Sequence, residues 1–493
     1  MRRSKKGFDN ELYVKKQSEN IKKRIKMFDN KLYLEFGGKL FDDYHAKRVL
    51  PGFELNAKIR LLQELKDESE VIFCINAKDI ERNKVRADFG ITYDMDVLRL
   101  IDELKHLGIS INSVVITLFI GQKSAIKFKE SLERRNIKTY LHTPTKGYPT
   151  DVDVIVSDEG YGANPFIETT KPLVVVTAPG PCSGKLATCL SQLYHEHKRG
   201  VKAGYAKFET FPVHDLPLKH PVNVAYEAAT AYLKDVNMID SFHLEAYNKV
   251  AVNYNRDLEV FPVLKNILNK ITDSDIYKSP IDMGVNTIGK CINDDDVVRK
   301  AANDEIIRRY LNSLVDYKKG LVTIDTVNRI KVLMDELNIS VADRSVVKAA
   351  LDKANQISKH VIALKLPNGK IITGRETNIL SPASALLLNA IKELTKIPDS
   401  VYLLSPSVLE PILKIKNDHD KLLHLNEVLI ALSICSVTNP TAEKALSNLK
   451  KLESLEAHAS YIVSGEDLRV LKSLNINLTC ESVYYSNELY FGN

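Results

Sequence analysis

The sequence predicts a multi-domain α/β protein built from three successive regions. Strand and helix patterns alternate over residues 1–230, helical spacing dominates over 231–319, and alternation returns over 320–493. Alternation is typical of a parallel sheet covered by helices, whereas continuous helical spacing favours a helical domain. The 493 residues are enough for two to four domains.

In the first region, short apolar runs rich in β-branched residues are separated by helical patterns over 94–107 and 123–135. We expect a largely parallel sheet that binds ligands at the carboxyl ends of its strands. The predicted strands are 31–36, 71–76, 114–120, 152–156, 173–177 and 201–208.

The two later regions differ in their patterns. Helical spacing in the middle region covers 222–235, 241–257, 264–271 and 296–316, with a loop at 279–286. We therefore predict a helical domain and, after it, a second α/β domain. The strand candidates of that last domain are 360–366, 370–373, 401–404, 459–463 and 477–481.

The stretch LVVVTAPGPCSGKLAT (173–188) runs from a predicted strand through a Gly/Pro loop into a helical pattern. Backbone N–H groups of such a loop, together with the helix N-terminus, hold phosphate, and a lysine adds charge. The alternative is a strand-to-helix turn with a solvated lysine. The predicted phosphate or nucleotide site consists of Gly180, Ser183, Gly184, Lys185, Thr188 and Lys207.

The loop departs from the P-loop motif at two positions. Pro179 stands where the first glycine belongs, and Leu186 stands where the Mg²⁺-binding hydroxyl belongs. Thr188 is too far along the helix to replace that hydroxyl simply. The loop therefore does not support a magnesium site.

Residues 173–212 resemble the opening of dethiobiotin-synthetase-like P-loop proteins, which makes the first region Rossmann-like or P-loop-like. In those proteins the second strand ends in a lysine that also reaches phosphate. Lys207 matches that position, and the resemblance implies a second phosphate contact there. The alternative is a surface lysine at a strand end.

Four polar residues follow this strand and form a candidate substrate rim. Asn223 and Glu227 lie four residues apart, which places them on one helix face. Capping and turn hydrogen bonds are the alternative role for these side chains. The predicted rim consists of Glu209, His220, Asn223 and Glu227.

Residues 360–374 are predicted to form two strands joined by a tight Pro-Asn-Gly turn, followed by a helix near 386–394. This order resembles cytidine-deaminase-like domains, whose helix carries a zinc ligand and the catalytic glutamate. Here those positions hold Ser384, Ala385 and Leu386, and SPSVLE (405–410) replaces the P-C-x-x-C segment. The resemblance implies a zinc-free deaminase-like scaffold.

Composition indicates which partners and cofactors the protein is not expected to bind. The net charge of +6 comes from 69 basic and 63 acidic residues that are interleaved along the chain, so we do not expect nucleic acid as a partner. Six cysteines without C-x-x-C spacing argue against zinc and against a disulfide framework. No apolar run reaches the roughly 18 residues of a membrane span. We expect a cytoplasmic homo-oligomer that binds a small phosphorylated ligand and no membrane.

Over nearly its whole length the chain resembles a family of uncharacterised bacterial proteins of roughly 500 residues. Two distinctive strings that carry the resemblance are TAPGPCSGKLATCLSQLYH (177–195) and HPVNVAYEAAT (220–230). The resemblance implies an α/β N-terminal region, a helical middle and a deaminase-like C-terminal part, and glycine is usual where Cys182 stands. It implies no activity.

Two function hypotheses remain open. The first is an enzyme of phosphoryl or nucleotidyl chemistry acting on a nucleotide or phosphorylated metabolite at 178–188. The second is a non-catalytic ligand-binding or regulatory oligomer that uses the same loop. Clustered polar residues at 207–227 favour the first hypothesis, and the missing Mg²⁺ hydroxyl favours the second.

Overall fold

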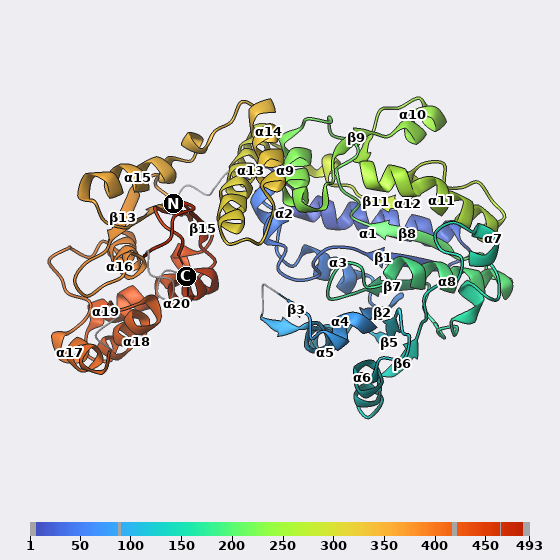
Figure 1. Cartoon of the computed structure of the whole chain (residues 1–493), viewed down its shortest axis with the longest axis horizontal. Coiled ribbons are helices and arrows are strands. Elements are labelled where there is room, and N and C mark those ends of the chain that lie inside the picture. The colour runs from blue at the N-terminus through green and yellow to red at the C-terminus, as the bar shows by residue number, and fades with distance from the viewer. Residues whose placement is uncertain (1–5, 87–89, 417–421, 464, 487–493) are drawn as a thin grey trace. The chain divides into compact units, whose positions relative to one another are not determined.

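A computed structural model describes residues 6–86, 90–416, 422–463 and 465–486, which form a mixed α/β protein (Figure 1). The chain divides into two compact units, Met1–Ala302 and Asn303–Asn493. Residues 231–319, predicted as a middle domain, are shared between the two units. The long helix α13 (Asp295–Lys318) crosses the boundary.

The first unit is built on a seven-stranded sheet of order β11-β8-β1-β7-β2-β5-β6, in which every neighbouring pair is parallel. Its inner strands are almost fully buried, which explains their continuous apolar runs. The strands are β1 (Leu32–Phe36), β2 (Ser69–Asn76), β5 (Ile111–Thr117), β6 (Lys138–Leu141), β7 (Leu173–Thr177), β8 (Gly204–Phe208) and β11 (Gly284–Val285).

Helix α8 (Lys185–Lys198) packs on β1, β7 and β8. The Tyr33 hydroxyl of β1 donates a 2.8 Å hydrogen bond to Glu196 of α8, so Tyr33 and, two residues on, Glu35 lie on the α8 face of the sheet. The other helices of this unit are α1 (Asn10–Met27), α2 (Tyr44–Val49), α3 (Ala57–Glu64), α4 (Ala77–Glu81), α5 (Tyr93–His106), α6 (Lys123–Glu133), α7 (Val152–Ile155), α9 (Pro221–Ala229), α10 (Ser241–Tyr247), α11 (Asn255–Thr272) and α12 (Pro280–Met283).

Two predicted strands are wrong, and a third, 459–463, shares only Ala459 with a strand of the structure. Residues 152–156 contain the short helix α7, because the Asp151 carboxylate accepts a hydrogen bond from the Val154 amide and caps it. Residues 401–404 form no strand; Leu403 and Leu404 pack instead into a buried helical cluster. The predicted loop at 279–286 contains α12 and also β11, which pairs with β8 at the edge of the sheet.

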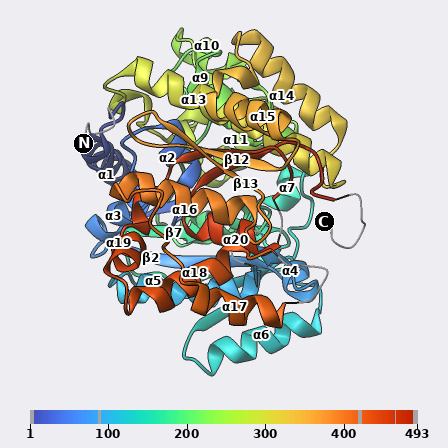
Figure 2. The same cartoon turned by 90° about the vertical axis from the view of Figure 1, so that its left-hand side faces the viewer.

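The second unit has a four-stranded sheet of order β13-β12-β14-β15. Its first two pairs are antiparallel and its last is parallel. Helices α15 (Ser345–Ile357) and α16 (Pro382–Thr395) pack on opposite sides of β12 and β13 (Figure 2). The strands are β12 (Val361–Lys365), β13 (Ile371–Arg375), β14 (Glu456–Ala459) and β15 (Asn477–Cys480).

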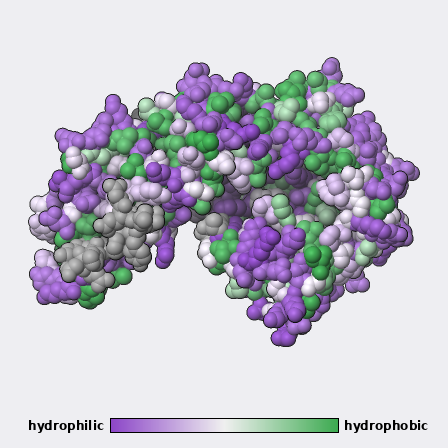
Figure 3. Space-filling view, in the orientation of Figure 1, coloured by the Kyte–Doolittle hydropathy of each residue, from purple (hydrophilic) through white to green (hydrophobic). Residues whose placement is uncertain are grey.

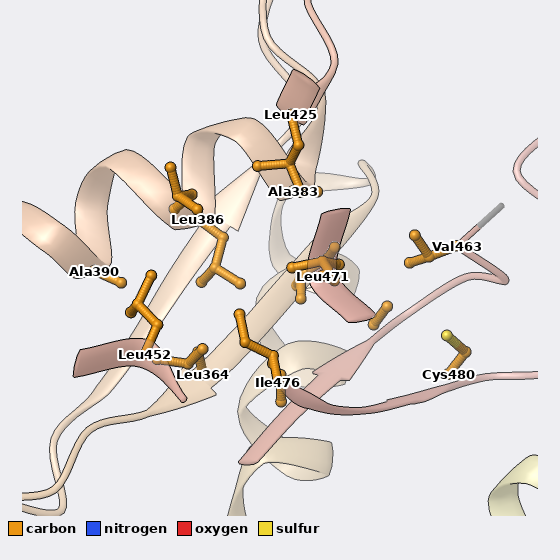
Figure 4. Packing of buried hydrophobic residues seen from close by; sticks show 14 of the residues in the cluster. Leu364, Ala383, Leu386, Ala390, Leu425, Leu452, Val463, Leu471, Ile476 and Cys480 are labelled. Atoms are coloured by element: carbon orange, nitrogen blue, oxygen red, sulfur yellow. The ribbon is translucent and has the colours of Figure 1, made fainter. Parts of the chain in front are cut away.

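The core of this unit is aliphatic. Leu386 of α16 points toward Leu364 of β12 and Leu471 of α20, among side chains that are almost fully buried (Figure 4). A second cluster lies among the later helices. The remaining helices are α14 (Ile324–Glu336), α17 (Pro406–Ile415), α18 (Leu425–Ser436), α19 (Pro440–Leu446) and α20 (Gly465–Ser473).

The small antiparallel pairs are β3 (Val85–Arg86) with β4 (Ile91–Thr92) and β9 (Asn237–Ile239) with β10 (Val252–Tyr254). Exposed apolar side chains gather around β9 and α10, where Figure 3 shows green atoms at the upper right. They include Tyr232, Met238, Leu244 and Val250. Within the described residues, no helix combines the length and apolarity needed to cross a membrane.

Candidate phosphate site at the carboxyl edge of the first sheet

The loop 178–184 lies between β7 and α8, at the carboxyl edge of the parallel sheet. Gly184 precedes α8 with φ +82°, a left-handed conformation that glycine adopts without steric cost. A Cβ at Gly184 would lie 2.8 Å from the side chain of Thr117. Both the backbone conformation and the neighbouring strand therefore require glycine here.

The ends of two other strands hold the loop in place. Thr117 of β5 donates a 2.7 Å hydrogen bond to the Ser183 carbonyl, and Asn76 of β2 donates a 3.3 Å bond to the Cys182 carbonyl. The Ser183 hydroxyl donates to the Gly180 carbonyl within the loop. These contacts fix the loop backbone but use the Ser183 side chain internally.

Lys185 begins α8 at the open end of this loop. No side chain caps the helix N-terminus. Lys185 is partly exposed and forms no hydrogen bond or ion pair with any described residue. Burial raises the pKa of the Cys74 thiol to about 12, and the positive charge of Lys185 opposes that rise.

Thr188 faces the core instead of the loop. Its side chain is almost fully buried, and its hydroxyl accepts a 3.4 Å hydrogen bond from the Cys74 thiol. The Thr188 hydroxyl therefore does not replace the hydroxyl missing at Leu186. No group of three or more histidine, cysteine or acidic side chains that suits a metal ion occurs among the described residues.

Lys207 of β8 lies beside two carboxylates. Its ammonium is 3.5 Å from Asp257 of α11, and Glu35 of β1 is its partner in the strand register. Burial lowers the pKa of Lys207, but the charges of Asp257 and Glu35 outweigh burial and raise it overall. Glu35 in turn accepts a 2.7 Å hydrogen bond from Tyr205.

A cavity of about 130 Å³ opens at Lys207, next to the first turn of α8. Leu186, which directly follows Lys185 in the chain, lines this cavity. Both polar and apolar side chains line it. The lining residues on which the argument below depends are the polar Glu35, Lys207, Asn253 and Asp257, and the apolar Leu186, Val260, Leu264 and Pro280.

Glu209, predicted to lie at a substrate rim, belongs to a buried charge cluster. Its carboxylate is 2.5 Å from the Lys58 ammonium, which is also 2.9 Å from Asp43, and it accepts a hydrogen bond from Tyr13. Burial raises the pKa of Glu209, against the lowering effect of Lys58. Burial lowers the pKa of Lys58, but the two carboxylates outweigh it and raise the pKa.

The other predicted rim residues have internal hydrogen-bond partners. Asn223 is fully buried and bonds the backbone of Val213 through both ends of its amide. His220 caps α9 and bonds Asp295 at 2.9 Å. Glu227 is only partly buried. A ligand-binding role for these residues stays a prediction.

Sequence reasoning missed four charged residues of this edge: Glu35, Asp43, Lys58 and Asp257. Glu35 had a visible signal, because it interrupts the apolar run LYLEF with a charge near the strand's carboxyl end. Lys58 and Asp257 lie in ordinary helical patterns, and nothing local marks their partners.

In the second unit, the positions predicted to correspond to the deaminase zinc site lie in the first turns of α16. Ser384 is fully buried, and its hydroxyl donates a 2.9 Å hydrogen bond to the Leu423 carbonyl. Leu386 belongs to the aliphatic core. These side chains pack and bond within the protein at the start of the helix.

Comparison with known proteins covers nearly the whole chain. The family described as domain of unknown function DUF1846, N-terminal, matches residues 6–338, and domain of unknown function DUF1846, C-terminal, matches residues 342–490. A UPF0371 protein of Clostridium tetani (strain Massachusetts / E88) is 56% identical over 500 residues, and one of Clostridium botulinum (strain Eklund 17B / Type B) is 57% identical. Each alignment covers 99% of both chains. The chain therefore belongs to the DUF1846 family.

Proposed function

We propose that this protein binds a phosphorylated small molecule at the loop 178–184 and the start of α8. The observation that carries the proposal is the uncapped N-terminus of α8 next to Lys185, whose ammonium has no ion-pair partner among the described residues. Unbonded N–H groups and the helix dipole favour an anion at such a position, and a lysine supplies a point charge.

Lys207 would act as the second cation. Asp257 already neutralises part of its charge, so Lys185 provides most of the attraction. Gly180 and Gly184 let the loop pack closely against its neighbours. A Cβ at these positions would meet the side chains of Tyr93 and Thr117 respectively.

Two roles for such a site are compatible with this geometry. Phosphoryl or nucleotidyl transfer would use the lysines to stabilise charge on the transferring group. A regulatory binding protein would use the same loop without turnover. The burial of Thr188 favours the binding role, because no hydroxyl follows Lys185 to hold the magnesium ion that P-loop transfer requires.

The test is thermal unfolding of the wild type and of Lys185→Ala with inorganic phosphate, sugar phosphates, nucleoside phosphates and polyphosphate. A ligand at a hundredfold excess over Kd stabilises the folded state by about 2.7 kcal/mol, which shifts Tm by a few degrees. We expect Lys185→Ala to abolish the shift and to leave the ligand-free Tm nearly unchanged.

Lys202→Ala is the matched control, because Lys202 is an exposed lysine just beyond the other end of α8. It should keep the ligand shift. An undiminished shift in Lys185→Ala would place binding elsewhere. Turnover of a phosphoester panel by the wild type, lost in Lys185→Ala, would decide for the enzymatic role.

We also infer that the second unit is a deaminase-like scaffold without zinc chemistry. The antiparallel pair β12–β13 followed by α16 supports this inference, as does Ser384 at the position of a zinc ligand. Elemental analysis of protein purified without chelator tests it. About one zinc per chain would contradict the inference.

A further inference from the structure

We infer that the cavity beside Lys207 receives the polyhydroxyl part of a monosaccharide monophosphate whose phosphate lies at Lys185. This inference rests on the proposed phosphate site and names the class of molecule that it binds. The two places are neighbours: Leu186, which lines the cavity, directly follows Lys185 at the start of α8.

The polar side chains of the lining suit a ligand rich in hydroxyl groups. The Glu35 and Asp257 carboxylates are acceptors, whereas the Lys207 ammonium is a donor. A sugar hydroxyl is both donor and acceptor, so adjacent hydroxyls can bond both kinds of group. Asn253, which also lines the cavity, is held in place by its 3.1 Å hydrogen bond to Asp240.

The charge of the cavity places the phosphate outside it. Two carboxylates face one ammonium, which leaves an excess of one negative charge. A phosphate inside the cavity would be repelled, whereas one at the uncapped end of α8 would be attracted. The same excess disfavours a second phosphate on the ligand, so the geometry points to a monophosphate.

The lining also has an apolar part, made of Leu186, Val260, Leu264 and Pro280. A sugar ring has C–H groups on its faces and hydroxyls around its edge, so a lining of both apolar and polar side chains suits it. Burial of the C–H groups against the apolar side chains adds a hydrophobic contribution.

Size separates a sugar from a whole nucleoside. The cavity measures about 130 Å³. Pockets that enclose drug-sized ligands span about 300–1,000 Å³. A single small ring fills the available space, and a base attached to it would remain outside. Phe261 is the one phenylalanine among the described residues of the lining, and its side chain is almost fully buried. The centroid of its ring lies 4.8 Å from that of Phe242. Little of the Phe261 ring is therefore free to stack on a base.

The experiment is isothermal titration of the full chain with four ligands: inorganic phosphate, glucose 6-phosphate, ribose 5-phosphate and adenosine monophosphate. We expect at least one of the two sugar phosphates to bind tenfold or more tightly than inorganic phosphate. Adenosine monophosphate should bind no more tightly than ribose 5-phosphate.

Val260→Trp is the decisive variant, because Val260 is partly exposed at the cavity and a larger side chain there fills it without removing a buried polar group. It should reduce sugar phosphate affinity to that of inorganic phosphate and leave inorganic phosphate binding unchanged. The control is Val332→Trp on α14, because this valine is exposed and does not line the cavity.

The outcomes separate this inference from the phosphate site itself. If inorganic phosphate binds and depends on Lys185, but sugar phosphates gain nothing or keep their advantage in Val260→Trp, only the sugar assignment is overturned. If sugar phosphates bind and lose affinity in Val260→Trp but not in Lys185→Ala, the cavity assignment stands and the placement of the phosphate at Lys185 is wrong. Tighter binding of adenosine monophosphate would replace the sugar with a nucleoside.

Discussion

Helices α8 and α16 each follow a strand and a turn, but their N-termini differ in how the first N–H groups are bonded. At α16, the Ser381 hydroxyl accepts a 3.2 Å hydrogen bond from the Ser384 amide, and Pro382 has no N–H to satisfy. At α8, Gly184 provides no cap and Lys185 supplies a free charge. One N–H group of α16 is thus bonded to a side chain, whereas no side chain caps α8, whose N–H groups the proposed function assigns to a ligand.

The two sheets differ in the same direction. The carboxyl end of β8 in the first sheet carries the Lys58–Glu209 and Lys207–Asp257 pairs. The core cluster to which α16 contributes consists mainly of leucines, alanines and isoleucines. A buried charge costs solvation free energy unless it is paired, so paired charges mark where polar chemistry has been retained. The substitutions below test this contrast.

The largest effect is expected for Lys58→Met. Removing the ammonium leaves the buried Glu209 and the partly buried Asp43 without their cation, which should lower the free energy of unfolding by about 3–5 kcal/mol. Urea unfolding at neutral pH measures this change. Lys105→Met, at an exposed lysine of α5, is the control. Equal stability of the two variants would show that the ion pairs of Lys58 do not stabilise the folded state.

Leu386→Ala tests the aliphatic side of the comparison. Leu386 is 1% exposed, and its truncation should cost about 2–5 kcal/mol through lost burial and a residual cavity. Leu321, which is 70% exposed in the same unit, provides the matched truncation with little expected change. The measurement is the unfolding transition of the second unit. A loss below about 1 kcal/mol would contradict tight packing at α16.

Gly184→Ala tests the requirement for glycine before α8. The positive φ costs about 1–2 kcal/mol, and the new Cβ would also meet Thr117. Gly200 has φ +84° and no atom within 4 Å of its ideal Cβ position, so Gly200→Ala reports the backbone cost alone. We expect Gly184→Ala to be the less stable variant and to weaken phosphate binding. If the two variants are equally stable, the contact with Thr117 contributes nothing.

Ser381→Ala removes the cap that distinguishes α16 from α8. The expected loss is about 1 kcal/mol, because the Ser384 amide loses its acceptor. Ser433→Ala, at an exposed position inside α18, should change stability by less than about 0.5 kcal/mol. Chemical unfolding of both variants checks the difference. A neutral Ser381→Ala would mean that the backbone geometry alone satisfies this helix start.

Cys182→Gly should change stability least, and it should raise the free energy of unfolding instead of lowering it. Cys182 has φ +57°, which costs free energy for any residue with a Cβ, although glycine loses more backbone entropy on folding. The net gain should be below about 1 kcal/mol, with phosphate affinity unchanged. Cys182→Val should destabilise the loop, since a β-branched residue fits this conformation poorly. A loss of ligand binding in Cys182→Gly would instead assign the thiol a role in the site.

Local signals predicted much of the fold. The run 173–177 became β7 at the predicted residues, and the hairpin at 360–374 became β12 and β13 with shifted ends. The prediction of a strand at 152–156 was wrong. A short alternation of apolar residues fits both a strand and a helix, and the cap that Asp151 provides stabilises the helix here. The family resemblance is confirmed by the DUF1846 matches over both halves of the chain.

The candidate site was predictable only where its residues are contiguous. Gly184 and Lys185 lie next to each other at a strand-to-helix turn, so the sequence alone determined their place at the carboxyl edge of the sheet. Short-range patterns carry such information because backbone conformation, capping and periodicity depend on near neighbours.

Tertiary structure decided which charges meet at that edge. Lys58 of α3 meets Glu209, which directly follows β8, and Lys207 of β8 meets Asp257 of α11. The cavity between β1, β8, α8 and α11 likewise exists only once the strand order is set. No local pattern encodes these pairings, since each depends on bringing together segments about 50–150 residues apart by burial of their apolar faces.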